Sequence, residues 1–103
     1  MLAHNVYFTL NEGTDANRQA LVASCKKYLS GHPGILFFAA GTLQDGLERP
    51  VNVRDFDVAL HVVFDSRASH DAYQDAPLHL QFVAENKPNW KHVRVFDSDV
   101  SSA

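Results

Sequence analysis

The stretch FDVALHVVF, residues 56–64, decides the fold class of this chain. Its alternate positions form one unbroken apolar side, made of Phe56, Val58, Leu60, Val62 and Phe64. The other side is mixed and only half polar. Strict alternation predicts a β-strand with one fully buried side. Such a strand needs neighbouring strands and covering helices that close a core over it.

Strands and helices follow one another on both sides of this stretch. The pattern predicts strands at residues 3–11, 35–41, 56–64 and 90–97, and helices at residues 14–30, 66–74 and 77–86. Thr14 or Asp15 can cap the first helix. Pro77 is expected in the first turn of the last helix, where proline loses no intrahelical hydrogen bond. Residues 42–55, with one glycine, one proline and five charges, are expected to form a loop.

The order β-α-β-β-α-β predicts an α+β fold of the ferredoxin-like type. In that fold, a four-stranded antiparallel sheet carries both helical regions on one face. A length of 103 residues suits one domain. We therefore expect a single domain over residues 1–97, followed by a flexible tail at residues 98–103.

The uncovered face of such a sheet would be unusually apolar. The residues concerned are either Phe37 and Ala39 or Leu36, Phe38 and Ala40, together with Ala59, Val63 and one side of Val93–Val95. A contiguous apolar patch of this kind usually marks an interface. We expect a second copy to cover it, giving a homodimer that pairs through the helix-free sheet face.

Composition limits the partners and the location. The chain has 9 Lys and Arg against 12 Asp and Glu, so its net charge of −3 attracts neither nucleic acid nor an anionic membrane. The single cysteine, Cys25, excludes an intramolecular disulfide and a cysteine-rich zinc site. Residues 1–10 lack the basic segment of a secretory signal, and no run reaches transmembrane length. We expect a cytoplasmic protein without nucleic-acid or membrane partners.

Six histidines are many for this length, and they stand at positions 4, 32, 61, 70, 79 and 92. Histidine transfers protons near neutral pH and is the commonest metal ligand. No HxH, HxxxH or HExxH spacing occurs, so the sequence predicts neither a metal nor a cofactor. His61 and His92 are expected at the dimer seam or in solvent, and His70 on the wet face of its helix. The carboxylates of Asp55, Asp57, Asp97 and Asp99 are expected to be solvated at strand ends.

Three stretches carry a family resemblance, namely LAHNVYFTL, FDVALHVVFDS and AYQDAPLHLQFV. The most specific arrangement is Tyr-x(3)-Pro-x-His-x(2)-Phe, formed here by Tyr73, Pro77, His79 and Phe82. From about Leu2 to Asp97 the chain resembles the stress-responsive dimeric A/B barrel (Dabb) family. It departs from the family pattern at Ala76 and Val58, where histidine is common.

The resemblance implies a fold and a set of candidate residues. Members of the family pair sheet to sheet into a dimeric α/β barrel, and most have no assigned reaction. A plant member is a polyketide cyclase that closes a poly-β-ketone by aldol condensation without metal or cofactor. Its active histidine and tyrosine match His79 and Tyr73, and a further pocket histidine matches His4.

The chemistry of these residue types suits that site. On a helix that begins at Pro77, His79 shares a face with Phe82 and points inward. A half-buried imidazole can remove a proton next to a carbonyl, while the Tyr73 hydroxyl holds the enolate oxygen. His4 ends an apolar strand side and needs a partner or a cavity. The residues expected to line an apolar substrate pocket are Phe8, Cys25, Leu60 and Phe82, with Cys25 as a buried inert thiol.

Three functions remain open at this point. The chain is a stress-associated homodimer with an apolar small-molecule pocket, a cofactor-free polyketide cyclase-like lyase, or a small cofactor-free monooxygenase of the same fold. Convergence of His79 and Tyr73 on an open cavity would favour the lyase. If the side chains of His79 and Tyr73 point apart, only the binding function remains.

Overall fold

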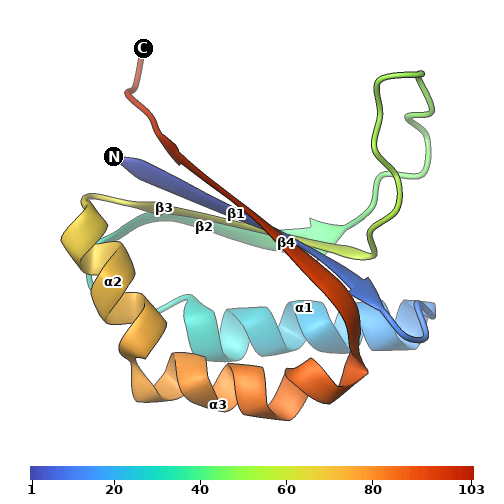
Figure 1. Ribbon diagram of the computed structural model, residues 1–103, viewed down its shortest axis with the longest axis horizontal. Coiled ribbons are helices and arrows are strands. Elements are labelled where there is room, and N and C mark those ends of the chain that lie inside the picture. Colours follow the sequence, from blue (N-terminus) through green and yellow to red (C-terminus); the bar gives the residue numbers. More distant parts are fainter.

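A computed structural model describes residues 1–103 as one antiparallel sheet with every helix on the same face (Figure 1). The elements are β1 (Leu2–Leu10), α1 (Asp15–Leu29), β2 (Ile35–Thr42), β3 (Val58–Phe64), α2 (Arg67–Asp75), α3 (Pro77–Asn86), the 3-10 turn η1 (Lys87–Asn89) and β4 (Trp90–Asp99). The strand order is β2-β3-β1-β4. The predicted ferredoxin-like α+β fold is confirmed. No helix combines the length and hydropathy that crossing a bilayer requires.

The helix α1 forms where local signals and packing agree. The Thr14 hydroxyl accepts a hydrogen bond from the backbone N–H of Asn17, which caps the first turn. Lys26 and Lys27 lie in the last turn, where the helix dipole favours positive charge. The helix buries Leu21, Val22, Cys25, Tyr28 and Leu29 in the core.

The strand β3 starts two residues later than its alternation predicts. The carboxylate of Asp57 is buried and accepts a hydrogen bond from the backbone N–H of Leu10. The carboxylate also binds Arg18, and the backbone N–H of Asp57 donates to the carbonyl of Phe8, but the regular ladder begins only at Val58. Phe56 therefore lies outside the strand, with its ring edge against Tyr7. The expectation that Asp57 is solvated was wrong.

A break at Ala76 separates α2 from α3. Ala76 has extended backbone, with ψ of 141°, and Pro77 follows it. Proline disfavours helical geometry in the residue before it, which is why one helix ends and the next begins here. The break lets Tyr73 of α2 and His79 of α3 approach one cavity from two helices.

The last strand is longer than expected. Ser98 and Asp99 were assigned to a flexible tail at residues 98–103, yet they pair with Ala3 and Leu2 at the end of the β1–β4 ladder. The backbone N–H of Val100 adds a hydrogen bond to the carbonyl of Met1. Because β1 begins at Leu2, its antiparallel partner extends to the same point.

The register of β2 decides which residues lie on the helix-free face. Phe37 and Ala39 lie there, opposite Val63 and His61, whereas Phe38 and Ala40 face the helices. Arg94 is the only one of Val93–Val95 on this face. The loop at residues 43–57 rises on the same side, away from the helices (Figure 1).

Candidate functional site

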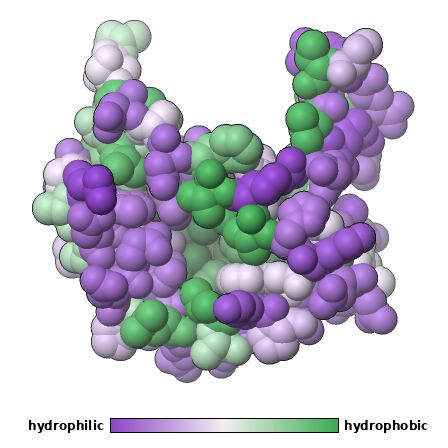
Figure 2. Space-filling view, viewed as in Figure 1, coloured by the Kyte–Doolittle hydropathy of each residue, from purple (hydrophilic) through white to green (hydrophobic).

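A cavity of about 360 Å³ lies between the sheet and the helices α2 and α3. Figure 2 looks onto the β4 edge and shows apolar side chains around a hollow in the middle of the molecule. The sequence-predicted site residues that line the cavity are His4, Phe8, Leu60, Tyr73, His79 and Phe82. The structure thus brings together residues from β1, β3, α2 and α3.

Cys25 does not line this cavity, which corrects the prediction for that residue. Its side chain is fully buried on the side of α1 that packs into the core. The cavity lies nearer β1 and β4, beneath α2 and α3, so α1 does not present Cys25 to it. Burial raises the pKa of the Cys25 thiol to about 12. It is an inert core residue.

Tyr73 stands at the centre of a group of rings. Its side chain is 2% exposed, and its ring centroid lies 4.7 Å from that of His79 and 6.1 Å from that of His4. Burial raises the pKa of the Tyr73 phenol. At neutral pH the hydroxyl therefore keeps its proton and can donate a hydrogen bond.

His79 offers a nitrogen that nothing in the protein engages. Its Nδ1 is buried and has no hydrogen-bond partner. Burial lowers the pKa of His79, and the neighbouring His4 and His32 lower it further. The imidazole is therefore neutral at physiological pH and can accept a proton. His79 and Tyr73 both line the cavity, with their ring centroids 4.7 Å apart.

The imidazole of His4 is held in place by a hydrogen bond to another cavity residue, Asp97. Its Nδ1 lies 2.5 Å from Oδ1 of Asp97, the residue opposite it in the β1–β4 ladder. Burial lowers the pKa of His4 even though Asp97 opposes that shift. Asp97 was expected to be solvated at a strand end. Its side chain is indeed exposed, at 45%, but it also pairs with a buried histidine, which was not predicted.

His70 is a site residue that the sequence argument placed wrongly. It was expected on a wet helix face, but its side chain is only 14% exposed. Its ring packs 5.0 Å from that of His4 and 5.6 Å from that of Phe64, measured between centroids. One ligand atom each from His4, His70 and Asp97 lies within 4.8 Å of the others. These residues come from β1, α2 and β4, so no short spacing motif could reveal them.

The other histidines are engaged elsewhere. His61 bonds Asn5 at 2.7 Å on the helix-free face, and His92 contacts Thr9 at 3.2 Å. His32 Nε2 bonds the carbonyl of Tyr28 at 2.8 Å. The ring of His32 also packs against the ring of Tyr73, at a surface depression separate from the cavity.

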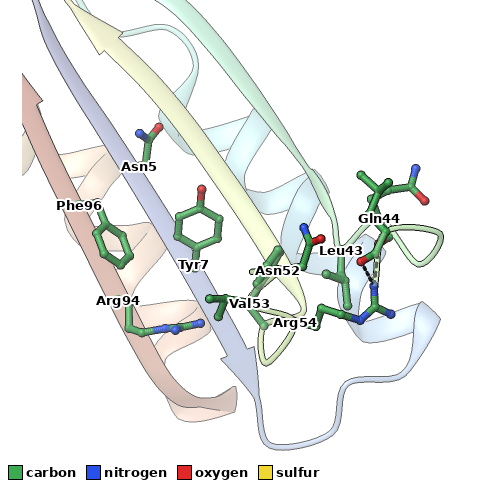
Figure 3. A pocket seen from close by; sticks show the side chains of 11 residues that line it. Asn5, Tyr7, Leu43, Gln44, Asn52, Val53, Arg54, Arg94 and Phe96 are labelled. Atoms are coloured by element: carbon green, nitrogen blue, oxygen red, sulfur yellow. Dashed lines mark hydrogen bonds between the residues drawn. The ribbon is translucent and has the colours of Figure 1, made fainter. Parts of the chain in front are cut away.

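A second cavity, of about 420 Å³, lies on the helix-free face beneath the loop (Figure 3). Tyr7, Phe96 and Arg94 form its floor, and Arg54 and Val53 stand at the loop side. Both arginines make hydrogen bonds, although Nε of Arg94 is buried without a partner. Arg94 binds Asp55 at 2.6 Å, and Arg54 donates to the carbonyl of Leu47 at 2.6 Å. No histidine lines this space, in contrast to the first cavity.

Comparisons with known proteins agree with this architecture. A family model described as "Stress responsive A/B Barrel Domain" matches residues 2–100. The chain is similar to a Dabb family protein with a ferredoxin-like fold from Mesorhizobium loti, with 23% identity and a TM-score of 0.79, covering 98% of this chain and 97% of that one. It is similar to a dimeric ferredoxin-like protein of unknown function from Thermobifida fusca, with 19% identity and a TM-score of 0.77, covering 96% and 90%.

A further similar structure is the hydroxynitrile lyase from Passiflora edulis, with 18% identity and a TM-score of 0.77, covering 99% of this chain and 94% of that one. At these identities the solved structures show the fold alone. No curated protein matches the chain.

Proposed function

Because the chain belongs to the stress responsive A/B barrel domain family, we propose that the cavity beneath α2 and α3 binds a small carbonyl compound and transfers a proton from it. The reaction is of the lyase type. His79 takes a proton from the carbon next to the carbonyl, and the electron pair of that C–H bond moves to the carbonyl oxygen. The α-carbon of the resulting enolate then attacks the carbon of a second carbonyl and forms a carbon–carbon bond, and the proton held by His79 passes to the alkoxide oxygen of the product.

The unpartnered nitrogen of His79 is the observation that carries this proposal. A buried polar atom without a partner costs about 1–3 kcal/mol, so the unpaired Nδ1 of His79 and Nε1 of Trp90, both in residues that line the cavity, suit a polar ligand. The ring of His79 lies on the cavity wall, and the proposed proton transfer requires the buried Nδ1 to reach the bound molecule by rotation of this ring. Because the pKa of His79 is lowered by burial, the neutral form that acts as a base predominates at neutral pH.

Tyr73 and His4 complete the polar side of the site. The protonated Tyr73 hydroxyl is a hydrogen-bond donor in a largely apolar surrounding, where its stabilisation of a developing enolate oxygen is strong. His4, held by Asp97, supplies a second polar contact. Phe8, Leu60 and Phe82 form the apolar walls, which suit an aromatic or ketide-like compound. The hydroxynitrile lyase with a similar fold shows that this architecture hosts lyase chemistry.

Hydrogen–deuterium exchange tests the proton transfer directly. Aryl ketones and aryl 1,3-diketones are incubated with the protein in D₂O, and exchange next to the carbonyl is followed by NMR. The wild-type protein should speed exchange of at least one compound over the buffer rate. His79→Ala should return exchange to that rate, and Tyr73→Phe should slow it. His92→Gln, outside the cavity, should leave it unchanged. Equal rates for wild type and His79→Ala would leave a binding function only.

We also propose that the helix-free face pairs with a second copy of the chain. Phe37 and Phe96 are 57% and 55% exposed there, beside Tyr7 and Val63. An exposed apolar surface of this extent is uncommon on a monomer. The similar protein from Thermobifida fusca is dimeric. The loop at residues 43–57 rises over the same face and would enclose the edge of the second copy (Figure 1).

The mass in solution tests the pairing. Light scattering on an eluting peak should give twice the chain mass of 11.5 kDa at micromolar concentration. Phe37→Asp places a charge in the proposed seam and should give monomers. Leu80→Asp, at an equally exposed apolar position on α3, should remain dimeric. A wild-type protein that elutes as a monomer would overturn the proposal.

A further inference from the structure

His4 of β1, His70 of α2 and Asp97 of β4 meet at one wall of the cavity. One ring nitrogen of each histidine and one carboxylate oxygen of Asp97 lie within 4.8 Å of one another. We propose that these three side chains bind a divalent transition-metal ion of the zinc class, with an open coordination position toward the cavity. The proposal concerns ion binding alone and does not rest on the proton transfer proposed above.

The separations are close to those of an occupied site. A tetrahedral ion bound about 2.1 Å from each ligand holds its ligand atoms about 3.4 Å apart. Atoms up to 4.8 Å apart therefore need to approach by as much as about 1.4 Å, whereas Nδ1 of His4 and Oδ1 of Asp97, 2.5 Å apart, would separate slightly if both bind the ion. Asp97 can supply this movement because its side chain is 45% exposed and lies on the edge strand β4. His4 is buried and provides the fixed point.

A hydrogen bond already orients His70 as a ligand. Its Nδ1 lies 3.0 Å from Oδ1 of Asp71, and Arg67 holds that carboxylate at 2.9 Å. Because an ionised carboxylate only accepts, Nδ1 carries the proton and the lone pair is on Nε2. Nε2 has one long contact, with the amide nitrogen of Gln74 at 3.5 Å. A carboxylate behind a ligating histidine is the usual outer layer of a metal site.

The pair His4–Asp97 offers the charge that a dication needs. The two residues share a hydrogen bond of 2.5 Å between Nδ1 and Oδ1, and an ion can take the place of that proton. No lysine or arginine lines the cavity, so no side-chain cation competes with a metal there. A metal ion binds the neutral form of each imidazole, so the ligand set contributes one negative charge, from Asp97.

The donor set defines the class of ion. Imidazole nitrogen favours Zn²⁺, Co²⁺, Ni²⁺ or Fe²⁺, whereas Mg²⁺ and Ca²⁺ prefer oxygen ligands alone. Three protein ligands leave at least one position open, as in catalytic rather than structural zinc sites. Tyr73 and His79 line the same cavity, so a small molecule bound to the ion would lie beside them.

Metal titration of the chelator-stripped chain tests the site. Zn²⁺ binding is followed by calorimetry, and Co²⁺ binding by the visible absorption that a nitrogen- and oxygen-ligated ion shows. We expect one ion per chain. His70→Phe keeps a ring against His4 and Phe64 but removes the donor, so this ion and the Co²⁺ spectrum should be lost. Asp71→Asn leaves the ligands in place and should weaken binding by about 10- to 100-fold.

Two controls separate this proposal from surface binding and from the proton transfer. His92→Phe makes the same change at an exposed histidine outside the cavity and should bind as the wild type does. His79→Gln removes the proposed base but no ligand and should also retain the ion. The site is refuted if the wild type binds no ion, or if His70→Phe and Asp71→Asn, both checked for folding by circular dichroism, bind as tightly as the wild type.

Discussion

Two nitrogens of Arg18 in α1 contact the same oxygen of the buried Asp57 carboxylate. Its Oδ1 lies 2.9 Å from Nε and 2.8 Å from Nη2. The other carboxylate oxygen accepts the backbone N–H of Leu10 at 2.8 Å. One ion pair therefore joins the first helix to the place where β1 ends and β3 begins.

Loss of Arg18 should cost more stability than loss of any surface arginine. Arg18→Met leaves the Asp57 charge buried and unpaired, and we expect a loss of about 3 kcal/mol in the free energy of unfolding, measured with urea. Arg67→Met removes an exposed pair with Asp71 and should cost about 0.5 kcal/mol or less. Equal losses would mean that the Asp57 carboxylate is solvated.

Gly13 is required by the same carboxylate. A Cβ at this position would overlap the carboxylate atoms of Asp57. Gly13→Ala should therefore lower the free energy of unfolding by about 1–3 kcal/mol, as overpacking does. Gly31→Ala is the matched control, because nothing lies within 4 Å of a Cβ there. A neutral Gly13→Ala would show that Asp57 can move away without loss.

The thiol of Cys25 should be unreactive in the folded protein. Its pKa is raised to about 12 by burial, so almost no thiolate forms at about pH 8. Iodoacetamide should label it only after unfolding in urea, as read by mass spectrometry. Cys25→Ala should also leave carbonyl exchange unchanged, since the residue does not line the cavity. Rapid labelling without urea would contradict this placement.

Stability should fall when the solution is acidified, and His79 should contribute to the fall. Burial lowers the pKa of His79 in the folded protein below its value of 6.5 in the unfolded chain. When the pH falls below 6.5, the unfolded chain binds a proton at His79 more readily than the folded protein does. Proton binding therefore stabilises the unfolded state relative to the folded state. Urea midpoints at about pH 8 and about pH 5 measure the effect. His79→Gln should show a smaller difference between them, and an unchanged difference would exclude His79 as a source.

The fold could be predicted where a local pattern and the tertiary packing demand the same structure. The Thr14 cap, the apolar stripe of α1 and the alternation of β3 are read directly from neighbouring residues. Phe56 shows the limit. It fits the alternation, but it lies outside the strand. The next residue, Asp57, binds the distant Arg18, and the regular β1–β3 pairing begins only at Val58.

The site was predicted less completely than the fold. His79, Tyr73 and His4 reach one cavity, but their partner Asp97 depends on the register between β1 and β4, which alternation does not specify. His70 was missed although it precedes Tyr73 by three residues, and residues at that spacing share a helical face. This spacing was the one signal that could have placed His70 in the cavity wall.

Both ends of the chain lie together, since Val100 donates a hydrogen bond to Met1 and residues 100–103 rise away from the helices (Figure 1). A purification tag fused at either end would therefore sit beside the same sheet edge, next to the surface proposed for self-association. Tag removal before any mass measurement follows from this geometry. The closeness of the ends also makes the chain suitable for circular permutation, with a short peptide joining the old ends and new ends opened in the loop at residues 43–57.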